Sequence, residues 1–208
     1  IKDPDIDIVV EMLGGIEPAT SFMVQAMKHG KHVVSANKAA IAANYDLLTK
    51  TAAENNVEFL FEASVAGGIP VLTAITGALA SNNFVEVMGI LNGTTNYILT
   101  KMTDEGLSYD EVLKDAQAKG FAEADPTADV EGIDAANKLS ILIALAFDRY
   151  IAPGDIPTTG ITAITAKDIE EAAAQGKKIK LIGRASVADG KLSYQVKPVL
   201  LDITHPLA

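Results

Sequence analysis

A single lysine, Lys138, separates an acidic segment of the chain from an apolar one. Asp134 lies four residues earlier, and this spacing places both side chains on one face of a helix. The residues after Lys138 are apolar nearly all around the helix, which is typical of a buried helix. Burial lowers the pKa of a lysine and nearby carboxylates raise it, so a balance of the two can prepare an ammonium to donate a proton. Two interpretations stay open: a surface ion pair worth roughly 0.3–0.5 kcal/mol, and a lysine that transfers protons.

The segment before Lys138 carries five carboxylates, which are Glu123, Asp125, Asp129, Glu131 and Asp134. It does not fit an EF-hand loop, because Val130 replaces the required Gly when the loop starts at Asp125. A start at Thr127 instead puts Lys138 where the loop needs Glu. Magnesium bound by two or three of these carboxylates stays open. A solvated acidic loop with a helix cap best explains Asp125 and Glu131.

The remaining polar motifs indicate little about function when each is taken alone. The three histidines, His29, His32 and His205, have no spacing that indicates a catalytic triad or a zinc site. The chain has no cysteine, which excludes disulfides and Cys-type zinc sites. The stretch "LNGTTN" at 91–96 predicts an Asn-Gly turn followed by a Thr N-cap. Lys38, in "SANK" at 35–38, is by itself only a lysine at a strand end.

Residues 5–62 predict alternating strands and helices. Three short apolar strands are expected within 5–13, 30–36 and 57–64, with helices ending at Met27 and spanning 45–55. This alternation is typical of βαβ units with a parallel sheet. Ligands bind beyond the carboxyl ends of the strands in such sheets, where residues 12–15, 35–38 and 62–68 fall.

No strand here is followed by a G-x-G-x-x-G turn, which a dinucleotide-binding fold needs at its start. We therefore expect an α/β chain with an incomplete Rossmann-like parallel βαβ portion whose first half precedes Ile1. The expected domains are 1–62, the remaining half of the nucleotide-binding domain, and 63–208, the substrate-binding, catalytic and dimerisation domain.

The second domain predicts an α+β fold with a mixed sheet. Its expected elements are a helix over 69–80, a strand over 84–91, helices over 96–106 and 108–120, a long helix after Asp134, a helix over 166–175 and a hairpin of 178–187 with 191–201. Ser108 and Glu111 have the spacing of a capping box. Gly176 is expected to end the helix before the hairpin.

Composition excludes some classes of partner. The net charge is −10 and the chain has no basic cluster, so nucleic acid and anionic membranes are poor partners. The longest apolar run, 139–147, is shorter than the roughly 18 residues that span a bilayer. Asp3, Asp5 and Asp7 interrupt any secretory signal pattern, and we expect a cytoplasmic protein.

Several motifs together resemble the homoserine dehydrogenase family, and their order and spacing match over nearly the whole chain. They are "GGIEPA" at 14–19, "HVVSANKA" at 32–39, "FEASVAGGIPVL" at 61–72, "GILNGTTNYIL" at 89–99, "GFAEADPTADVEGIDAANKLSIL" at 120–142, "GIT" at 160–162, "IKLIG" at 179–183 and "HPLA" at 205–208. The resemblance implies an oxidoreductase that interconverts L-aspartate 4-semialdehyde and L-homoserine with NADP or NAD. This step lies on the route to threonine, methionine and isoleucine.

The resemblance also implies roles for residues of the acidic segment. Lys138 corresponds to the group that donates a proton to the aldehyde oxygen and accepts it in the reverse direction. Glu123 and Asp134 correspond to the positions that bind the substrate, whose amino group is a cation. Asp129 lies in the same loop and is expected to support the site.

The same resemblance implies contacts to the cofactor, a bound cation and an oligomeric state. Gly120 corresponds to a position where the backbone approaches the cofactor, and Lys38 to a lysine near the nicotinamide and the substrate that assists binding or catalysis. A monovalent cation such as sodium is expected at Glu62, Val65, Gly67 and Ile69. The family also implies a homodimer.

Two features depart from the family pattern: the Gly-rich turn is absent, and the family continues beyond "HPLA". We therefore expect the 208-residue chain alone to bind NAD(P)H weakly. Calorimetry that gives a micromolar dissociation constant would contradict this. Two alternatives remain: a catalytically silent module that binds substrate or dimerises, and a related dehydrogenase of another amino-acid aldehyde.

Overall fold

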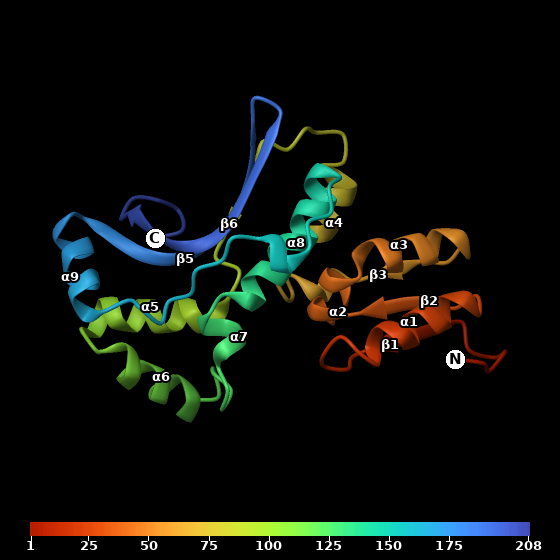
Figure 1. The fold of residues 1–208 in the computed structure, drawn as a ribbon, viewed down its shortest axis with the longest axis horizontal. Helices are drawn as coiled ribbons and strands as arrows, with labels where there is room; N and C mark the ends of the chain where they lie inside the picture. The colour runs from red at the N-terminus through yellow and green to blue at the C-terminus, as the bar shows by residue number, and fades with distance from the viewer. The chain divides into compact units, whose positions relative to one another are not determined.

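The computed structural model describes residues 1–208 and divides into two compact units. Unit 1 comprises 1–84 and 140–153, and unit 2 comprises 85–139 and 154–208. Helix α8, Ile133–Phe147, carries the chain from unit 2 into unit 1 (Figure 1). The boundary expected at residues 62 and 63 concerns functional domains and stays a prediction.

Unit 1 contains a parallel sheet of three strands in the order β1-β2-β3. The strands are β1 (Ile8–Glu11), β2 (His32–Ser35) and β3 (Phe59–Leu60), and the helices between them are α1 (Ala19–Lys28), α2 (Lys38–Ala43) and α3 (Tyr45–Glu54). Helix α1 contacts β1, β2 and α3. Glu11 and Ser35 are paired in register, so the carboxyl ends of β1 and β2 lie next to each other. The predicted βαβ organisation is confirmed.

Unit 1 differs from the expectation at three points. Helix α2 was not predicted, and the strand expected over 57–64 is limited to β3 before a 3-10 turn, η1 (Glu62–Ser64). The helix expected over 69–80 is a short α4 (Val71–Thr73) followed by a π-helix, η2 (Ala74–Ala78). The carboxylate of Glu62 accepts hydrogen bonds from the backbone N–H groups of Leu72 and Thr73. These bonds turn Glu62 toward the start of α4, so it does not continue the strand.

Unit 2 contains an antiparallel sheet of three strands in the order β4-β5-β6. The strands are β4 (Glu86–Gly89), β5 (Lys177–Ala188) and β6 (Lys191–Asp202), and the helices are α5 (Gly93–Glu105), α6 (Tyr109–Ala118), α7 (Thr127–Val130) and α9 (Ala166–Ala174), with a 3-10 turn η3 (Pro153–Asp155) at the boundary. Helices α5 and α9 both contact β5. A parallel bridge between Thr158 and Val196 adds to the antiparallel pairing.

The hairpin of β5 and β6 confirms the sequence prediction. Its two loop residues, Asp189 and Gly190, have φ angles of 51° and 72°. Positive φ at both central residues is the requirement of a type I′ turn, whose twist matches that of the flanking strands.

Helix ends in unit 2 confirm two expected caps and correct a third. Ser108 and Glu111 form the predicted capping box of α6, and Gly176, the expected stop after α9, is in the left-handed conformation with a φ of 66°. The Thr N-cap expected within "LNGTTN" is wrong, because the side chain of Asn92 accepts the backbone N–H of Thr95 at 2.8 Å. Helix α5 therefore begins at Gly93, three residues before the expected start at 96.

Among the glycines of unit 2, Gly160 leaves the least room for a side chain. A Cβ at this position would lie 2.2 Å from the carbonyl oxygen of Val130 and 2.6 Å from the Cα of Glu131. Both are backbone atoms just before α8, and the N–H of Ile161 donates to the same Val130 oxygen at 2.8 Å. The segment around Gly160 thus fixes the start of α8.

We expect Gly160→Ala to destabilise the protein by about 2 kcal/mol or more, because overpacking against backbone cannot be relieved by a rotamer change. The measurement is the urea midpoint of unfolding. Gly154→Ala is the matched control, since nothing lies within 4 Å of a Cβ there. Equal midpoints for the two variants would contradict the assignment.

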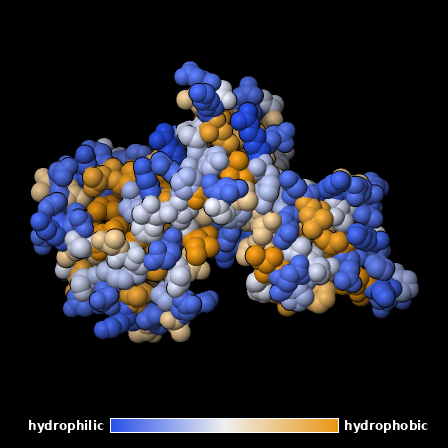
Figure 2. Space-filling view, viewed as in Figure 1, coloured by the Kyte–Doolittle hydropathy of each residue, from blue (hydrophilic) through white to orange (hydrophobic).

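Apolar side chains reach the surface of both units (Figure 2). In the parallel sheet, alternate residues of one face are exposed, with Ile8 at 56%, Val10 at 61% and Leu60 at 55%. None of the helices has the length and apolar character that crossing a membrane would require.

Candidate functional site

Lys138 and Asp134 form an ion pair on the first two turns of α8, as the spacing predicted. Lys138 Nζ lies 2.7 Å from Asp134 Oδ2 and also donates to the carbonyl oxygen of Leu91 at 2.8 Å. The side chains of Lys138 and Asp134 are only 18% and 7% exposed. This burial distinguishes the pair from a solvated surface ion pair, and the bond to Leu91 fixes the ammonium from a second direction.

The ammonium of Lys138 can serve one further acceptor. A lysine ammonium carries three hydrogens, and two are used by Asp134 and Leu91. The third can point to an oxygen of a bound molecule. The geometry therefore suits donation of a proton to an oxygen.

Asn92 is a site residue that the sequence interpretation missed. Its Nδ2 donates to Asp129 Oδ1 at 2.6 Å and to Asp134 Oδ2 at 2.9 Å. Its Oδ1 caps α5 by accepting the N–H of Thr95, so the cap fixes which end of the amide faces the carboxylates. Asn92 is 4% exposed. The amide thus links Asp129 to Asp134, the carboxylate that pairs with Lys138.

These contacts disfavour magnesium at the acidic segment. The oxygens of Asp129 and Asp134 described above accept from N–H donors of Asn92 and Lys138. The structure has no group of three or more His, Cys, Asp or Glu side chains suited to a metal ion. Asp129 and Asp134 instead accept from the amide of Asn92, and Asp134 also pairs with the ammonium of Lys138.

Glu123 and Gly120 lie in the segment between α6 and α7. Gly120 has a φ of 74°, and nothing lies within 4 Å of a Cβ built there. Glu123 has an exposed carboxylate and makes no hydrogen bond to Asp134 or Lys138. The structure thus joins Asp134 to Lys138 directly and Asp129 to Asp134 through the amide of Asn92, but it does not join Glu123 to them.

The backbone of this segment is nevertheless anchored to α5 and α6. Thr94 Oγ1 donates to the carbonyl oxygen of Phe121 at 2.8 Å, and Gln117 Nε2 donates to that of Glu123 at 3.1 Å. The rings of Phe121 and Tyr97 lie 4.9 Å apart. Three contacts therefore fix the course of the segment that carries Gly120 and Glu123.

Tyr97 is itself held by charged neighbours. Its hydroxyl donates to Asp115, and together with the ammonium of Lys119 it lowers the pKa of Asp115 to about 2. Asp115 consequently stays ionised at any physiological pH. The ring of Tyr97, which lies against that of Phe121, is thus held by a carboxylate that stays ionised.

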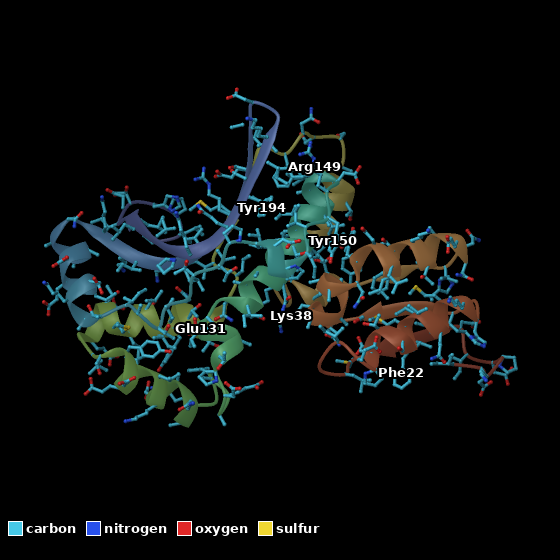
Figure 3. The ribbon with its side chains drawn as sticks, viewed as in Figure 1. Phe22, Lys38, Glu131, Arg149, Tyr150 and Tyr194 are labelled. Atoms are coloured by element: carbon cyan, nitrogen blue, oxygen red, sulfur yellow. The ribbon has the colours of Figure 1, made fainter.

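Lys38 belongs to unit 1, where it is the first residue of α2 and follows the carboxyl end of β2 (Figure 3). Its side chain is half-buried. The other end of α2 is also anchored, because the hydroxyl of Tyr150 donates to the carbonyl oxygen of Ala42 at 2.8 Å. Lys38 therefore lies at the sheet edge where the sequence placed it.

The turn after β3 contains the residues expected to bind a cation. The carboxylate of Glu62 accepts from the N–H groups of Leu72 and Thr73 and from the hydroxyl of Thr73. These bonds lower the pKa of Glu62 in spite of the opposing effect of desolvation. A carboxylate has about four acceptor positions, so one is left for a further ligand. Ala66 and Gly67 follow with φ angles of 62° and 58°.

Comparison with known proteins identifies the family. The family model described as homoserine dehydrogenase matches residues 70–208, and the model of the homoserine dehydrogenase NAD binding domain matches residues 1–62. The chain belongs to the homoserine dehydrogenase family. The resemblance seen in the sequence motifs is confirmed.

Relatives within the family cover the whole chain. The homoserine dehydrogenase of Bacillus subtilis is 48% identical over 208 residues, which are 100% of this chain and 48% of that protein. That of Corynebacterium glutamicum is 46% identical, again over 100% of this chain and 48% of the relative. The chain thus spans about half the length of the curated relatives it matches.

Solved structures of family members share the fold. A homoserine dehydrogenase from Thiobacillus denitrificans aligns with a TM-score of 0.95 and 45% identity over 98% of this chain and 47% of that one. A hyperthermophilic archaeal homoserine dehydrogenase in complex with NADPH aligns with a TM-score of 0.80 and 30% identity over 97% of this chain and 58% of that one. The predicted combination of a parallel βαβ portion and an α+β portion is confirmed.

Proposed function

We propose that this chain forms the catalytic portion of an NAD(P)-dependent homoserine dehydrogenase, which interconverts L-aspartate 4-semialdehyde and L-homoserine (EC 1.1.1.3). One observation carries the proposal. Lys138 is a shielded ammonium held by Asp134 and Leu91, with a third hydrogen available to a substrate oxygen. Membership of the homoserine dehydrogenase family supplies the substrate class. The product would feed the synthesis of threonine, methionine and isoleucine in the cytoplasm.

Lys138 would handle the proton of this reaction. The cofactor, when bound, supplies the hydride for the aldehyde carbon. Negative charge then grows on the oxygen, and a donor within hydrogen-bond reach stabilises it and completes the alcohol. The third hydrogen of Lys138 provides that donor, and in the reverse direction the neutral amine accepts the proton of the alcohol. The bonds to Asp134 and Leu91 keep Nζ in place in both directions.

Glu123 and Asp134 would bind the amino group of the substrate. Both are carboxylates, and an ammonium pairs best with ionised acceptors. Asp134 already contacts Lys138 and Asn92 through Oδ2. Glu123 is exposed and its backbone is anchored by Gln117, so its carboxylate is available to a ligand. Asp129 would support Asp134 through the amide of Asn92.

Lys38 and Gly120 would contribute to cofactor binding. The edge of a parallel sheet is where such folds bind nucleotides, and Lys38 lies at that edge in unit 1. Gly120 offers open backbone without a Cβ contact. Lys38 would contact the nicotinamide end of NAD or NADP, and the open backbone at Gly120 would allow the cofactor to approach.

We further propose a monovalent cation such as sodium in the turn after β3. The acceptor position left on Glu62 and the backbone carbonyls of Val65, Gly67 and Ile69 would provide oxygens, which hard cations prefer. Ala66 and Gly67 have left-handed φ angles, which bend the backbone within this turn. Activity that is identical in sodium and in a large organic cation would contradict this.

A homodimer is proposed for the complete protein on the basis of family membership. Unit 2 carries exposed apolar residues at the ends of its sheet, among them Leu200 at 48% and Val85 at 72%. Sedimentation of the complete protein as a monomer at micromolar concentration would contradict the dimer.

The test of the proposed function is a spectrophotometric assay of the complete protein. We expect formation of reduced nicotinamide that depends on L-homoserine, with either NAD or NADP as oxidant. Other amino alcohols, such as L-serine and L-threonine, serve as controls. Faster reduction of the cofactor with one of these would identify another amino alcohol as the substrate, and no reduction with any of them would favour a silent binding module.

A further inference from the structure

Glu11 is a buried carboxylate that the proposed reaction does not use. It ends β1 and is 4% exposed. Its Oε2 accepts from the hydroxyl of Ser35 at 2.5 Å, and its Oε1 accepts from the N–H of Leu13 at 2.6 Å and from the amide of Asn37 at 3.4 Å. All three donors are neutral groups. Burying a carboxylate is costly unless donors compensate it, so this arrangement is built around Glu11.

The bonds from Glu11 converge on the start of α2. Ser35 uses its hydrogen for Glu11 and accepts the backbone N–H of Asn37 at 3.0 Å. The Asn37 amide donates to Glu11 and to the carbonyl oxygen of Gly15 at 2.7 Å, while its Oδ1 caps α2 by accepting the N–H of Ala40 at 3.1 Å. Both the backbone and the side chain of Asn37 are therefore fixed.

Lys38 is the next residue, and its position follows from that of Asn37. Its own N–H donates to the carbonyl oxygen of Ala36 at 3.0 Å. Together with the four contacts of Asn37, this makes five polar contacts that determine the backbone on the amino-terminal side of Lys38, and two of the five end on Glu11 or pass through Ser35 to it. The far end of the same helix is held by Tyr150.

We infer that Glu11 is a positioning residue: through Ser35 and Asn37 it fixes the start of α2 and, with it, the direction in which Lys38 extends. This inference rests on the proposed role of Lys38 in cofactor and substrate handling. Glu11, the buried carboxylate at the end of β1, therefore affects turnover indirectly, through the position of Lys38.

The test is a double-mutant cycle with Glu11→Gln and Lys38→Ala in the complete protein. Glutamine has nearly the same shape, but one carboxylate oxygen becomes a donor, so either Ser35 or the pair of Leu13 and Asn37 loses its acceptor. We expect Glu11→Gln to lower kcat about tenfold in the unmodified background and less than about twofold when Lys38 is already alanine. Residues that act through one another show such non-additivity.

The unfolding midpoint separates the positioning role from a purely structural one. If Glu11 positions Lys38, Glu11→Gln should lower the unfolding midpoint equally in both backgrounds, but it should lower kcat much more when Lys38 is present. Glu58→Gln is the matched control, because Glu58 is an exposed carboxylate immediately before β3, the strand on the other side of β2 from β1. If Glu11→Gln does not fold, Ser35→Ala takes its place in the cycle, since it removes one link of the same chain.

The outcomes separate this inference from the proposed function. A tenfold loss of kcat in both backgrounds would overturn the positioning role while leaving the reaction intact. Normal turnover in Lys38→Ala would overturn the role of Lys38 and the inference with it. Absence of homoserine-dependent turnover in the unmodified protein would instead refute the proposed function.

Discussion

Lys138→Ala is expected to lower kcat for homoserine oxidation by about 10²- to 10⁴-fold, which is the typical contribution of general acid–base catalysis. The physical reason is the loss of the one ammonium that Asp134 and Leu91 orient in unit 2. The KM for homoserine should change little, because the proposed substrate-binding carboxylates, Glu123 and Asp134, remain. The measurement is steady-state formation of reduced nicotinamide in the complete protein.

Loss of charge and loss of proton transfer can be separated by a second variant. Lys138→Arg keeps a cation beside Asp134, but arginine has a pKa above about 12 and gives up a proton poorly. We expect it to fold at least as well as Lys138→Ala and to be similarly slow. Lys138→Arg with near-normal turnover would show that the site needs only a positive charge.

The control for Lys138→Ala is an ion pair with the same helical spacing. Lys167 and Glu171 are also four residues apart, with Nζ and Oε1 3.6 Å apart, but the lysine side chain is 81% exposed. Lys167→Ala should leave kcat unchanged and stability within about 0.5 kcal/mol. Near-normal homoserine-dependent turnover in Lys138→Ala itself would refute the assignment.

The sequence predicted those parts of the site that depend on local spacing. Asp134 and Lys138 share a helix face because they are four residues apart, and the apolar residues after them predicted the burial of the helix. The hairpin turn at Asp189 and Gly190 and the capping box at Ser108 are equally local. Each of these features is determined within a few residues of the chain.

Features that depend on distant contacts were missed. The role of Asn92 depends on Asp129 and Asp134, which lie 37 and 42 residues away along the chain. An Asn before Gly predicts a turn or a cap, and the pattern does not show what the other end of the amide contacts. The sequence pattern places Glu11 only within an apolar strand, whereas its burial depends on Ser35 and Asn37, which lie 24 and 26 residues away along the chain.

The second large effect on activity is expected at Asn92. Its amide caps α5 and also donates to Asp129 and Asp134, and substitutions can separate these two roles. Asn92→Ser keeps a good N-cap for α5, but the shorter side chain leaves Asp129 and Asp134 without the amide donor. A hydrogen bond to a charged group contributes about 1.5–3 kcal/mol. We therefore expect kcat/KM to fall roughly 10- to 10²-fold while the helix content stays unchanged. Normal activity in this variant would restrict Asn92 to capping.

Asn92→Asp tests the electrostatic part of the same argument. The new carboxylate can still accept the N–H of Thr95, but it replaces an amide donor that lies 2.6 Å from Asp129 and 2.9 Å from Asp134. The introduced carboxylate, Asp129 and Asp134 then repel one another, which raises the pKa of the introduced carboxylate above its value in the unfolded chain. The repulsion is then fully present above the raised pKa and is relieved as the pH falls through it.

The destabilisation of Asn92→Asp relative to the unmodified protein should consequently shrink between about pH 8 and pH 5. Asn92→Ser, which introduces no charge, should show a nearly constant difference over the same range. Thermal unfolding of the three proteins across this range makes the comparison. A difference for Asn92→Asp that does not vary with pH would mean that the new carboxylate does not face Asp129 and Asp134, and the cap would then not fix the orientation of the amide.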